Sequence, residues 1–216
     1  EVYLEAGSNG KRPRWPRWII GRFAERPFWR SADGVITVNR EVAAELNRRY
    51  GQPRREILVH NCPPLWDPNP RPTELREAIG VGPDVPVALY HGGLSAVRGL
   101  WQLMEAIRDP RLAAVHLVFL GYGPLEEELR TAAADPVYGG RVHVISAVSP
   151  EVLDRWVAGA DVGLMPNQPE TLNEIVSTPN KLFESISAGV PVVTSDFPER
   201  RRITQEDPAG RLGAVC

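Results

Sequence analysis

From Val87 onward, short apolar runs alternate with segments that have helical spacing. Each apolar run is followed by a turn and then by a helical stretch. This alternation is typical of βα units, and it predicts an α/β fold with a doubly wound parallel sheet, covered by helices on both faces. The expected strands lie at residues 87–91, 116–120, 141–146, 161–166 and 190–193.

The first part of the chain predicts a second, smaller α/β region. Residues 34–38 and 56–60 have strand character, and Asn39 is a suitable cap for a helix over residues 40–50. One strand–helix–strand unit is too small to be a domain. We therefore expect residues 1–60 to be the C-terminal remnant of a truncated N-terminal domain.

A proline-rich segment follows this region. Residues 61–72 contain five prolines and predict a stiff linker. Beyond it we expect an α/β domain over residues 73–216. We expect this domain to be incomplete at its C-terminus, because the chain stops in what looks like another strand.

Composition excludes several classes of protein. The net charge of −2 gives no reason to expect nucleic acid as a partner. Cys62 and Cys216 suggest neither a disulfide framework nor a metal site, which suits a reducing cytoplasm. There is no signal peptide and no apolar run of membrane-spanning length. The four histidines and the acids show no metal-ligand spacing, so we expect no metal.

Residues 11–30 are rich in Arg and Trp and contain one acid, Glu25. One interpretation is a weak contact with an anionic membrane, which would place the protein peripherally at the inner membrane face. The other is a helix packed on its own domain with a solvated basic face, and this is the interpretation that we favour.

A helix is predicted directly before the last expected strand. Thr178 is its expected N-cap and Pro179 its first residue. Lys181 lies in the first turn, where a cation opposes the helix dipole, and no acid precedes Glu184. Either Lys181 points into water, or an external anion binds there to free N–H groups and to Lys181.

A second helix start has the same charge pattern. Ser95 can cap it, and Arg98 follows with no acid before Glu105. The preceding pair, Gly92 and Gly93, allows backbone N–H groups to approach an oxyanion closely, and Arg98 can bind a phosphate through two parallel hydrogen bonds. The alternative is a tight turn with a surface arginine.

The glycine-rich turn at residues 121–124 is followed by acidic residues, unlike the helix starts at Ser95 and Thr178. Three glutamates, at positions 126–128, follow it, satisfy the helix dipole and would repel a phosphate. We therefore interpret Gly121 and Gly123 as a tight turn, and the full spacing of a dinucleotide fingerprint is missing.

Arg98 and Lys181 both follow strands at their carboxyl ends, where ligands bind in such sheets. Two cations favour a doubly charged anion such as a diphosphate. The Glu184 carboxylate can accept hydrogen bonds from both hydroxyls of a ribose, or it can pair with Lys181 on the helix surface. A diphosphate beside a ribose predicts a nucleotide site.

Three segments, in this order and spacing, resemble the nucleotide-sugar-binding half of the retaining group 1 glycosyltransferases of the GT-B fold. They are YHGGLSAVRGL, FLGYGP and PNKLFESISAGVPVV. The segments ADGVITVNREVAAEL and VHNCPP resemble the end of that family's N-terminal domain. The resemblance covers roughly residues 32–216. It implies a Rossmann-like donor domain and metal-independent, cofactor-independent sugar transfer from a UDP or GDP sugar with retention of configuration.

The resemblance also implies residue roles. Arg98 and Lys181 match positions that bind the donor's diphosphate, and Glu184 matches the acid that holds the ribose; these three are the expected catalytic group. The further donor-binding positions that it implies are Gly92, Gly93, Ala147, Val148, Thr178, Pro179, Asn180 and Leu182.

Two positions depart from the family pattern. Val176 stands where many members have a second acid near the sugar, and Glu174 is nearby but out of register. Gly93 stands where many members have Arg. In this family the N-terminal domain supplies the acceptor site, so we expect the isolated chain to be inactive.

The acceptor, whether glycan, lipid or small molecule, is not indicated by the sequence. Two other functions fit the same nucleotide site. One is a nucleotide-sugar epimerase of the same architecture, and the other is a non-catalytic nucleotide-binding module.

Overall fold

The computed structural model describes residues 25, 27–208 and 210–216. The chain divides into two units. The smaller unit comprises the described residues up to Asn61 together with 169–178 and 197–199, and the larger comprises 62–168, 179–196 and 200–216. Every helix among the described residues is too short or too polar to span a bilayer. Most of the basic segment 11–30, considered above for membrane contact, lies outside the described residues.

The smaller unit contains the predicted strand–helix–strand. Strands β1 (Val35–Thr37) and β2 (Glu56–Leu58) pair in parallel, and helix α2 (Arg40–Tyr50) connects them. The cap prediction is confirmed, because Asn39 Oδ1 accepts a hydrogen bond of 2.8 Å from Val42 N.

The same asparagine holds a second segment of the smaller unit. Asn39 Nδ2 donates to the carbonyl of Val176 at 2.8 Å and to Thr178 Oγ1 at 3.1 Å. Val176 ends helix α7 (Leu172–Val176), whose N-cap Thr171 accepts from Glu174 N. From the sequence, the segment between the strand at 161–166 and the helix that starts at Thr178 is predicted to be a loop. A helix of five residues carries too little periodic signal to be recognised in the sequence.

The larger unit is built on one parallel sheet of six strands, in the order β5-β4-β3-β6-β7-β8. This is the doubly wound arrangement that the βα rhythm predicted. The strands are β3 (Val87–Gly93), β4 (His116–Tyr122), β5 (Val142–Ser146), β6 (Val162–Met165), β7 (Val192–Thr194) and β8 (Gly213–Val215).

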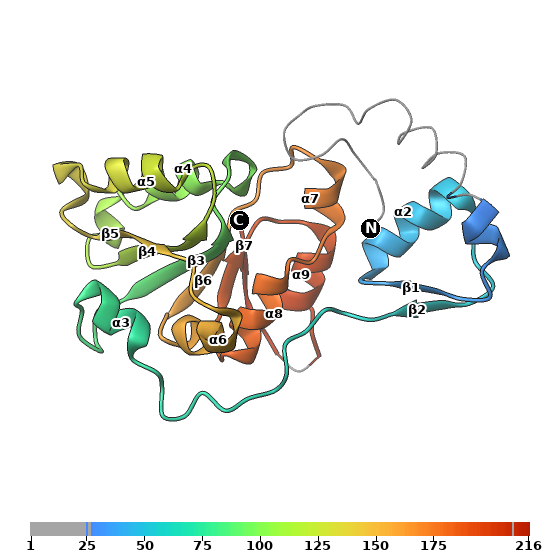
Figure 1. Cartoon of the computed structure of the whole chain (residues 1–216), viewed down its shortest axis with the longest axis horizontal. Helices are drawn as coiled ribbons and strands as arrows, with labels where there is room; N and C mark the ends of the chain where they lie inside the picture. The colour runs from blue at the N-terminus through green and yellow to red at the C-terminus, as the bar shows by residue number, and fades with distance from the viewer. Residues whose placement is uncertain (1–24, 26, 209) are drawn as a thin grey trace. The chain divides into compact units, whose positions relative to one another are not determined.

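Helices cover both faces of this sheet, as Figure 1 shows for α4 and α5 on one side and α3 and α6 on the other. They form between the strands, because each connection carries apolar residues at helical spacing. Their bounds are α3 (Glu74–Ile79), α4 (Leu100–Ala106), α5 (Glu126–Ala133), α6 (Pro150–Ala158), α8 (Asn180–Ser187) and α9 (Pro198–Gln205).

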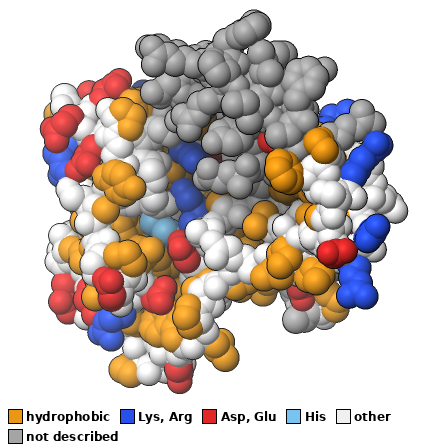
Figure 2. Space-filling model, turned by 45° about the vertical axis from the view of Figure 1, so that its right-hand side comes forward, with side chains coloured by type: hydrophobic (Ala, Val, Ile, Leu, Met, Phe, Trp, Pro, Cys, Tyr) orange, Lys and Arg blue, Asp and Glu red, His pale blue; other side chains and the backbone are white. Residues whose placement is uncertain are grey.

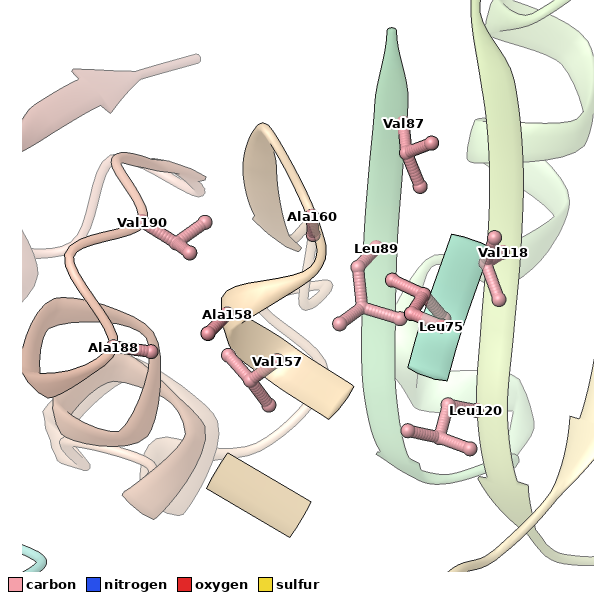
Figure 3. Close-up of a cluster of buried hydrophobic side chains, with 10 residues drawn as sticks. All are labelled: Leu75, Val87, Leu89, Val118, Leu120, Val157, Ala158, Ala160, Ala188 and Val190. Carbon is pink, nitrogen blue, oxygen red and sulfur yellow. The ribbon is translucent and has the colours of Figure 1, made fainter. Parts of the chain in front are cut away.

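The strands are apolar on both sides because each face of the sheet has its own core. Figure 3 shows the first core, where Leu89 and Leu120 from the strands meet Leu75 of α3 and Val157 of α6. The second core lies under α4 and α5. It includes Tyr90, Leu94, Leu100, Met104, Phe119 and Leu129.

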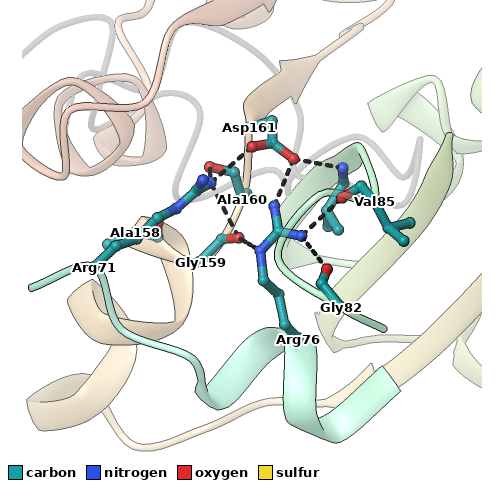
Figure 4. Close-up of polar contacts among 9 residues, drawn as sticks. Arg71, Arg76, Gly82, Val85, Ala158, Gly159, Ala160 and Asp161 are labelled. Atoms are coloured by element: carbon teal, nitrogen blue, oxygen red, sulfur yellow. Dashed lines mark hydrogen bonds and ion pairs between the residues drawn. The ribbon is translucent and has the colours of Figure 1, made fainter. Parts of the chain in front are cut away.

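Two arginines join the amino ends of β3 and β6 (Figure 4). Arg76, which is 5% exposed, donates to the carbonyls of Gly82, Val85 and Gly159 and, at 2.6 Å, to Asp161 Oδ2. The same carboxylate accepts from the backbone N–H of Val87 at 2.7 Å. One guanidinium thus donates to all three of these carbonyls where the strands begin.

The second arginine, Arg71, is more exposed. It donates to the carbonyls of residues 158–160 and to Asp161 Oδ1. Burial by itself would raise the pKa of Asp161, but the Val87 amide and the two guanidinium groups outweigh it and hold the pKa below its ordinary value.

We predict that Arg76→Met lowers the free energy of unfolding by about 2–4 kcal/mol, because it leaves the carbonyls of Gly82 and Val85 without this donor and leaves the partly exposed Asp161 with Arg71 as its guanidinium partner. Arg71→Met is the matched control. Its side chain is 45% exposed, so its loss is expected to cost about 1 kcal/mol or less. Urea denaturation measures the free energy of unfolding of both variants. Equal losses in the two variants would contradict the structural role of Arg76.

Strands β4 and β5 carry a histidine pair near their start. His116 Nδ1 and His143 Nε2 lie 2.9 Å apart, and the two rings differ by 13° in orientation. A hydrogen bond between two ring nitrogens requires that one carries the proton and the other accepts it. Burial lowers the pKa of both rings. The Arg141 guanidinium lowers the pKa of His116 further, and His116 lowers that of His143.

We predict that this histidine pair makes the free energy of unfolding smaller in acid. Both folded-state pKa values lie below the ordinary value of 6.5, so the unfolded chain binds more protons as the pH falls through that value. The free energy of unfolding should therefore be constant at higher pH and decrease below about pH 6.5. His143→Gln should make this decrease shallower but not abolish it, because buried His91 titrates in the same direction. Urea denaturation at several pH values tests the prediction, and an unchanged slope in the variant would contradict it.

Candidate functional site

The direction of winding in the sheet reverses between β3 and β6, which are neighbours although β4 and β5 separate them in sequence. Ligands of open α/β sheets bind at such a switch point, outside the carboxyl ends of the strands. The two loops that leave these strands meet there. Val97 O accepts from Gln168 N at 3.1 Å, and a Cβ on Gly99 would lie 1.9 Å from the carbonyl oxygen of Pro166. Gly99 is therefore required for this close approach.

Helix α8 brings Lys181 to the carboxyl end of β3. Lys181 is 9% exposed, and its Nζ lies 3.8 Å from the centroid of the Tyr90 ring. The interpretation that Lys181 points into water is therefore wrong. Contact with an aromatic face is worth about 2 kcal/mol when the cation is desolvated, so Tyr90 offsets part of the cost of burying the ammonium.

The position of α8 is fixed by packing on β6. Leu182 is fully buried in a small core with Met165 and Val192. One turn further on, Ser185 lies directly against Gly163, where a Cβ would come within 2.6 Å of the Ser185 hydroxyl. Because glycine at this position lets the helix approach the strand, the side chains of the first turn of α8 reach the end of β3.

Glu184 is held from the same strand. His91 Nε2 lies 2.9 Å from Glu184 Oε2, and His91 is 3% exposed. Burial lowers the pKa of His91; the hydrogen bond to Glu184 opposes this effect, and the Lys181 ammonium adds to it. Asp154 on α6 belongs to the same group of charges, since burial and then the Glu184 carboxylate raise its pKa.

Gly92 lies against the lysine. Its φ of +113° is in the left-handed region, and a Cβ placed there would be 3.2 Å from Lys181 Nζ. Gly93 follows directly, and a Cβ on it would meet nothing within 4 Å. The ammonium of Lys181 thus lies beside the first glycine of the loop that also carries Arg98.

Arg98 is partly buried at the end of a short 3-10 turn, Ala96–Arg98. Helix α4 begins after it, with Gly99 as N-cap, and Ser95 makes no side-chain cap hydrogen bond. The expected helix start at Ser95 is therefore wrong. The left-handed conformation of Gly99, with φ of +72°, interrupts the helix, and this places Arg98 in the loop rather than in the first turn.

The start of α8 differs from prediction in a similar way. The helix begins at Asn180, and its N-cap is Pro179, which has no side-chain cap hydrogen bond. Thr178 accepts from Asn39 in the smaller unit instead of capping α8. The Leu182 amide already donates to Pro179 O at 3.0 Å, and its side chain is buried, so Leu182 is a packing residue.

The remaining predicted donor positions follow β5. Ala147 is exposed, and Val148 packs partly against the core that Figure 3 shows. Both lie at the carboxyl end of a strand, on the same edge of the sheet as Gly92.

Gly121 and Gly123 have a packing explanation. A Cβ on Gly121 would lie 1.9 Å from Gly92 O, and one on Gly123 would lie 2.3 Å from Leu94 O. The backbone hydrogen bond from Leu94 N to Tyr122 O closes the same contact. These glycines allow the ends of β3 and β4 to lie together, in agreement with their interpretation as a structural turn.

Tyr90 and His91 were not among the residues predicted for the site. Both belong to a strand that reads as apolar. The available signal was a histidine next to the glycine pair at the end of a buried strand. Figure 2 shows basic side chains next to a histidine and acidic side chains on one face of the molecule. Within the described ranges, no group of three or more His, Cys, Asp or Glu is placed to hold a metal ion.

Comparisons with known proteins identify the family to which this sheet belongs. Residues 85–214 match the family model described as glycosyl transferases group 1. The chain is 28% identical over 194 residues to D-inositol 3-phosphate glycosyltransferase of Xylanimonas cellulosilytica, covering 84% of this chain and 45% of the relative. It is 27% identical over 121 residues to the amylovoran biosynthesis glycosyltransferase AmsK of Erwinia amylovora, covering 55% and 30%. The chain thus spans less than half the length of each of these relatives.

Solved structures share the fold. Sucrose-phosphate synthase from Thermosynechococcus elongatus superposes with a TM-score of 0.69 at 18% identity, covering 99% of this chain and 51% of that one. Anabaena Alr3699/HepE in complex with UDP-glucose superposes with a TM-score of 0.68 at 16% identity, covering 91% and 53%. The sheet of the larger unit is therefore of the Rossmann-like GT-B type. The chain belongs to the group 1 family of glycosyl transferases.

Proposed function

We propose that this chain carries the donor-binding part of a glycosyltransferase that moves a sugar from a nucleoside diphosphate to an acceptor with retention of configuration. The proposal rests on one observation: the buried ammonium of Lys181 and the carboxylate of Glu184, one turn apart on α8, both meet the carboxyl end of β3 at the switch point of the sheet. A nucleotide sugar offers a matching pair of groups, an anionic diphosphate and a ribose diol.

The proposed binding mode assigns one role to each charge. Lys181 and Arg98, with the backbone at Gly92 and Gly93, bind the diphosphate, since cations and closely approaching N–H groups stabilise phosphate oxygens. Glu184 accepts hydrogen bonds from the ribose hydroxyls. Ala147 and Val148 lie along the edge of the base. The solved structure of Anabaena Alr3699/HepE contains UDP-glucose, which makes UDP the first nucleotide to test here.

The same charges serve the transfer step. The acceptor hydroxyl oxygen bonds to the anomeric carbon on the face from which the diphosphate leaves, the bond from that carbon to the phosphate oxygen breaks, and the acceptor proton passes to the leaving phosphate. Negative charge grows on the diphosphate as the bond breaks. Lys181 and Arg98 bind that charge more strongly in the transition state than in the ground state, which is how fixed cations accelerate such a step. We propose that no metal ion or other cofactor takes part.

We predict that Arg98→Ala weakens binding of UDP by about 1.5–3 kcal/mol, or roughly ten- to a hundredfold, the loss expected for hydrogen bonds to a charged group. Arg111→Ala is the matched control, because Arg111 is 87% exposed and pairs with Asp109 away from this edge. Isothermal titration calorimetry measures both affinities. An unchanged affinity of the Arg98 variant would remove this residue from the site.

We predict that Glu184→Gln weakens UDP and GDP binding about tenfold while pyrophosphate binding stays the same, because only the nucleotides present a ribose diol. Glu127→Gln, at a side chain that is 89% exposed on α5, is the control and should change neither affinity. Equal losses for nucleotide and pyrophosphate would refute the ribose assignment.

A further inference from the structure

His91 is a buried titratable side chain in contact with Glu184. It lies at the carboxyl end of β3, is 3% exposed, and places Nε2 2.9 Å from Glu184 Oε2. An ionised carboxylate can only accept a hydrogen bond, so His91 Nε2 carries the proton of this pair. The bond fixes which oxygen of Glu184 points back into the protein.

The charges that face His91 come from two helices. Lys181 and Glu184 approach from α8, and Asp154 approaches from α6. Burial, the largest effect, lowers the pKa of His91, so the ring is neutral at neutral pH. A neutral donor holds the carboxylate without cancelling its charge, which leaves Glu184 able to accept from a ligand.

Glu184 has no other side-chain hydrogen bond in the part of the chain that the structure describes. Its Oε1 is thus the oxygen available to a ligand, while Oε2 is held by His91. The carboxyl group of a free glutamate rotates among several orientations, and its side chain loses this freedom when it binds. Because the hydrogen bond from His91 to Oε2 already restricts Glu184 in the free protein, less conformational entropy is lost when a ligand binds.

We propose that His91 is a positioning residue that orients Glu184 for the ribose, and that it thereby sets the preference of this site for nucleoside diphosphates over inorganic pyrophosphate. The inference rests on the proposed function. It assigns to His91 a role in selectivity, whereas a histidine that merely fills the core would affect both ligands alike.

The test is calorimetric titration of the chain and its variants with UDP and with pyrophosphate. His91→Leu removes the donor and is expected to weaken UDP about tenfold with pyrophosphate unchanged. His91→Gln can place an amide donor near the position of Nε2, and it should retain most of the UDP affinity. His91→Asn is too short to reach Oε2 and should behave like the leucine variant.

Each outcome decides the proposal. Weaker UDP binding in the Leu and Asn variants, with pyrophosphate unchanged and the Gln variant near wild type, supports it. UDP affinity equal to wild type in His91→Asn overturns it, and so does an equal loss of both ligands. If His91→Leu does not fold, the two polar variants decide between these results. A wild-type chain that binds pyrophosphate but not UDP or GDP overturns the proposed function itself, which separates the two failures.

Discussion

The structure depends on how the first turn of helix α8 meets the end of strand β3. Lys181 lies over the Tyr90 ring and beside Gly92, and Glu184 accepts from His91. A charged side chain is costly to bury, and Tyr90 compensates for the burial of Lys181, while His91 of the same strand holds the partly exposed Glu184. Two opposite charges are thereby fixed at the switch point of a parallel sheet, where this fold binds its ligands.

Packing away from the charges makes this arrangement possible. Gly163 lets α8 approach β6 closely enough for Ser185 to contact it, and Leu182 anchors the helix in the core. At the amino ends of the strands, Arg76 and Asp161 connect the start of β3 to the start of β6. Strands β3 and β6 are thus held by one set of interactions where they begin and by another where they end. Substitutions at Arg76 and Asp161 therefore test the stability of the sheet, and substitutions at Lys181 and Glu184 test the site.

Much of this could be predicted from the sequence, because parallel strands and amphipathic helices have strong periodic signals. The strands from β3 to β7 and the helices α2 and α6 appear where the pattern placed them. What could not be predicted depends on contacts between segments far apart in the sequence. Asn39 holds Thr178, so Thr178 does not cap α8, and the conformation of Gly99 moves Arg98 out of the helix. His91 lies in an apolar strand, and its partner is 93 residues away.

The most direct test of the account is an NMR titration of the isotopically labelled chain with UDP, followed through the backbone amide signals. The account predicts that the largest shifts fall on Gly92, Gly93 and the start of α8, at Asn180 and Lys181. Shifts confined to the first turn of α5, where three glutamates stand, or no shifts at all would contradict the claim that the ends of β3 and α8 together bind a diphosphate.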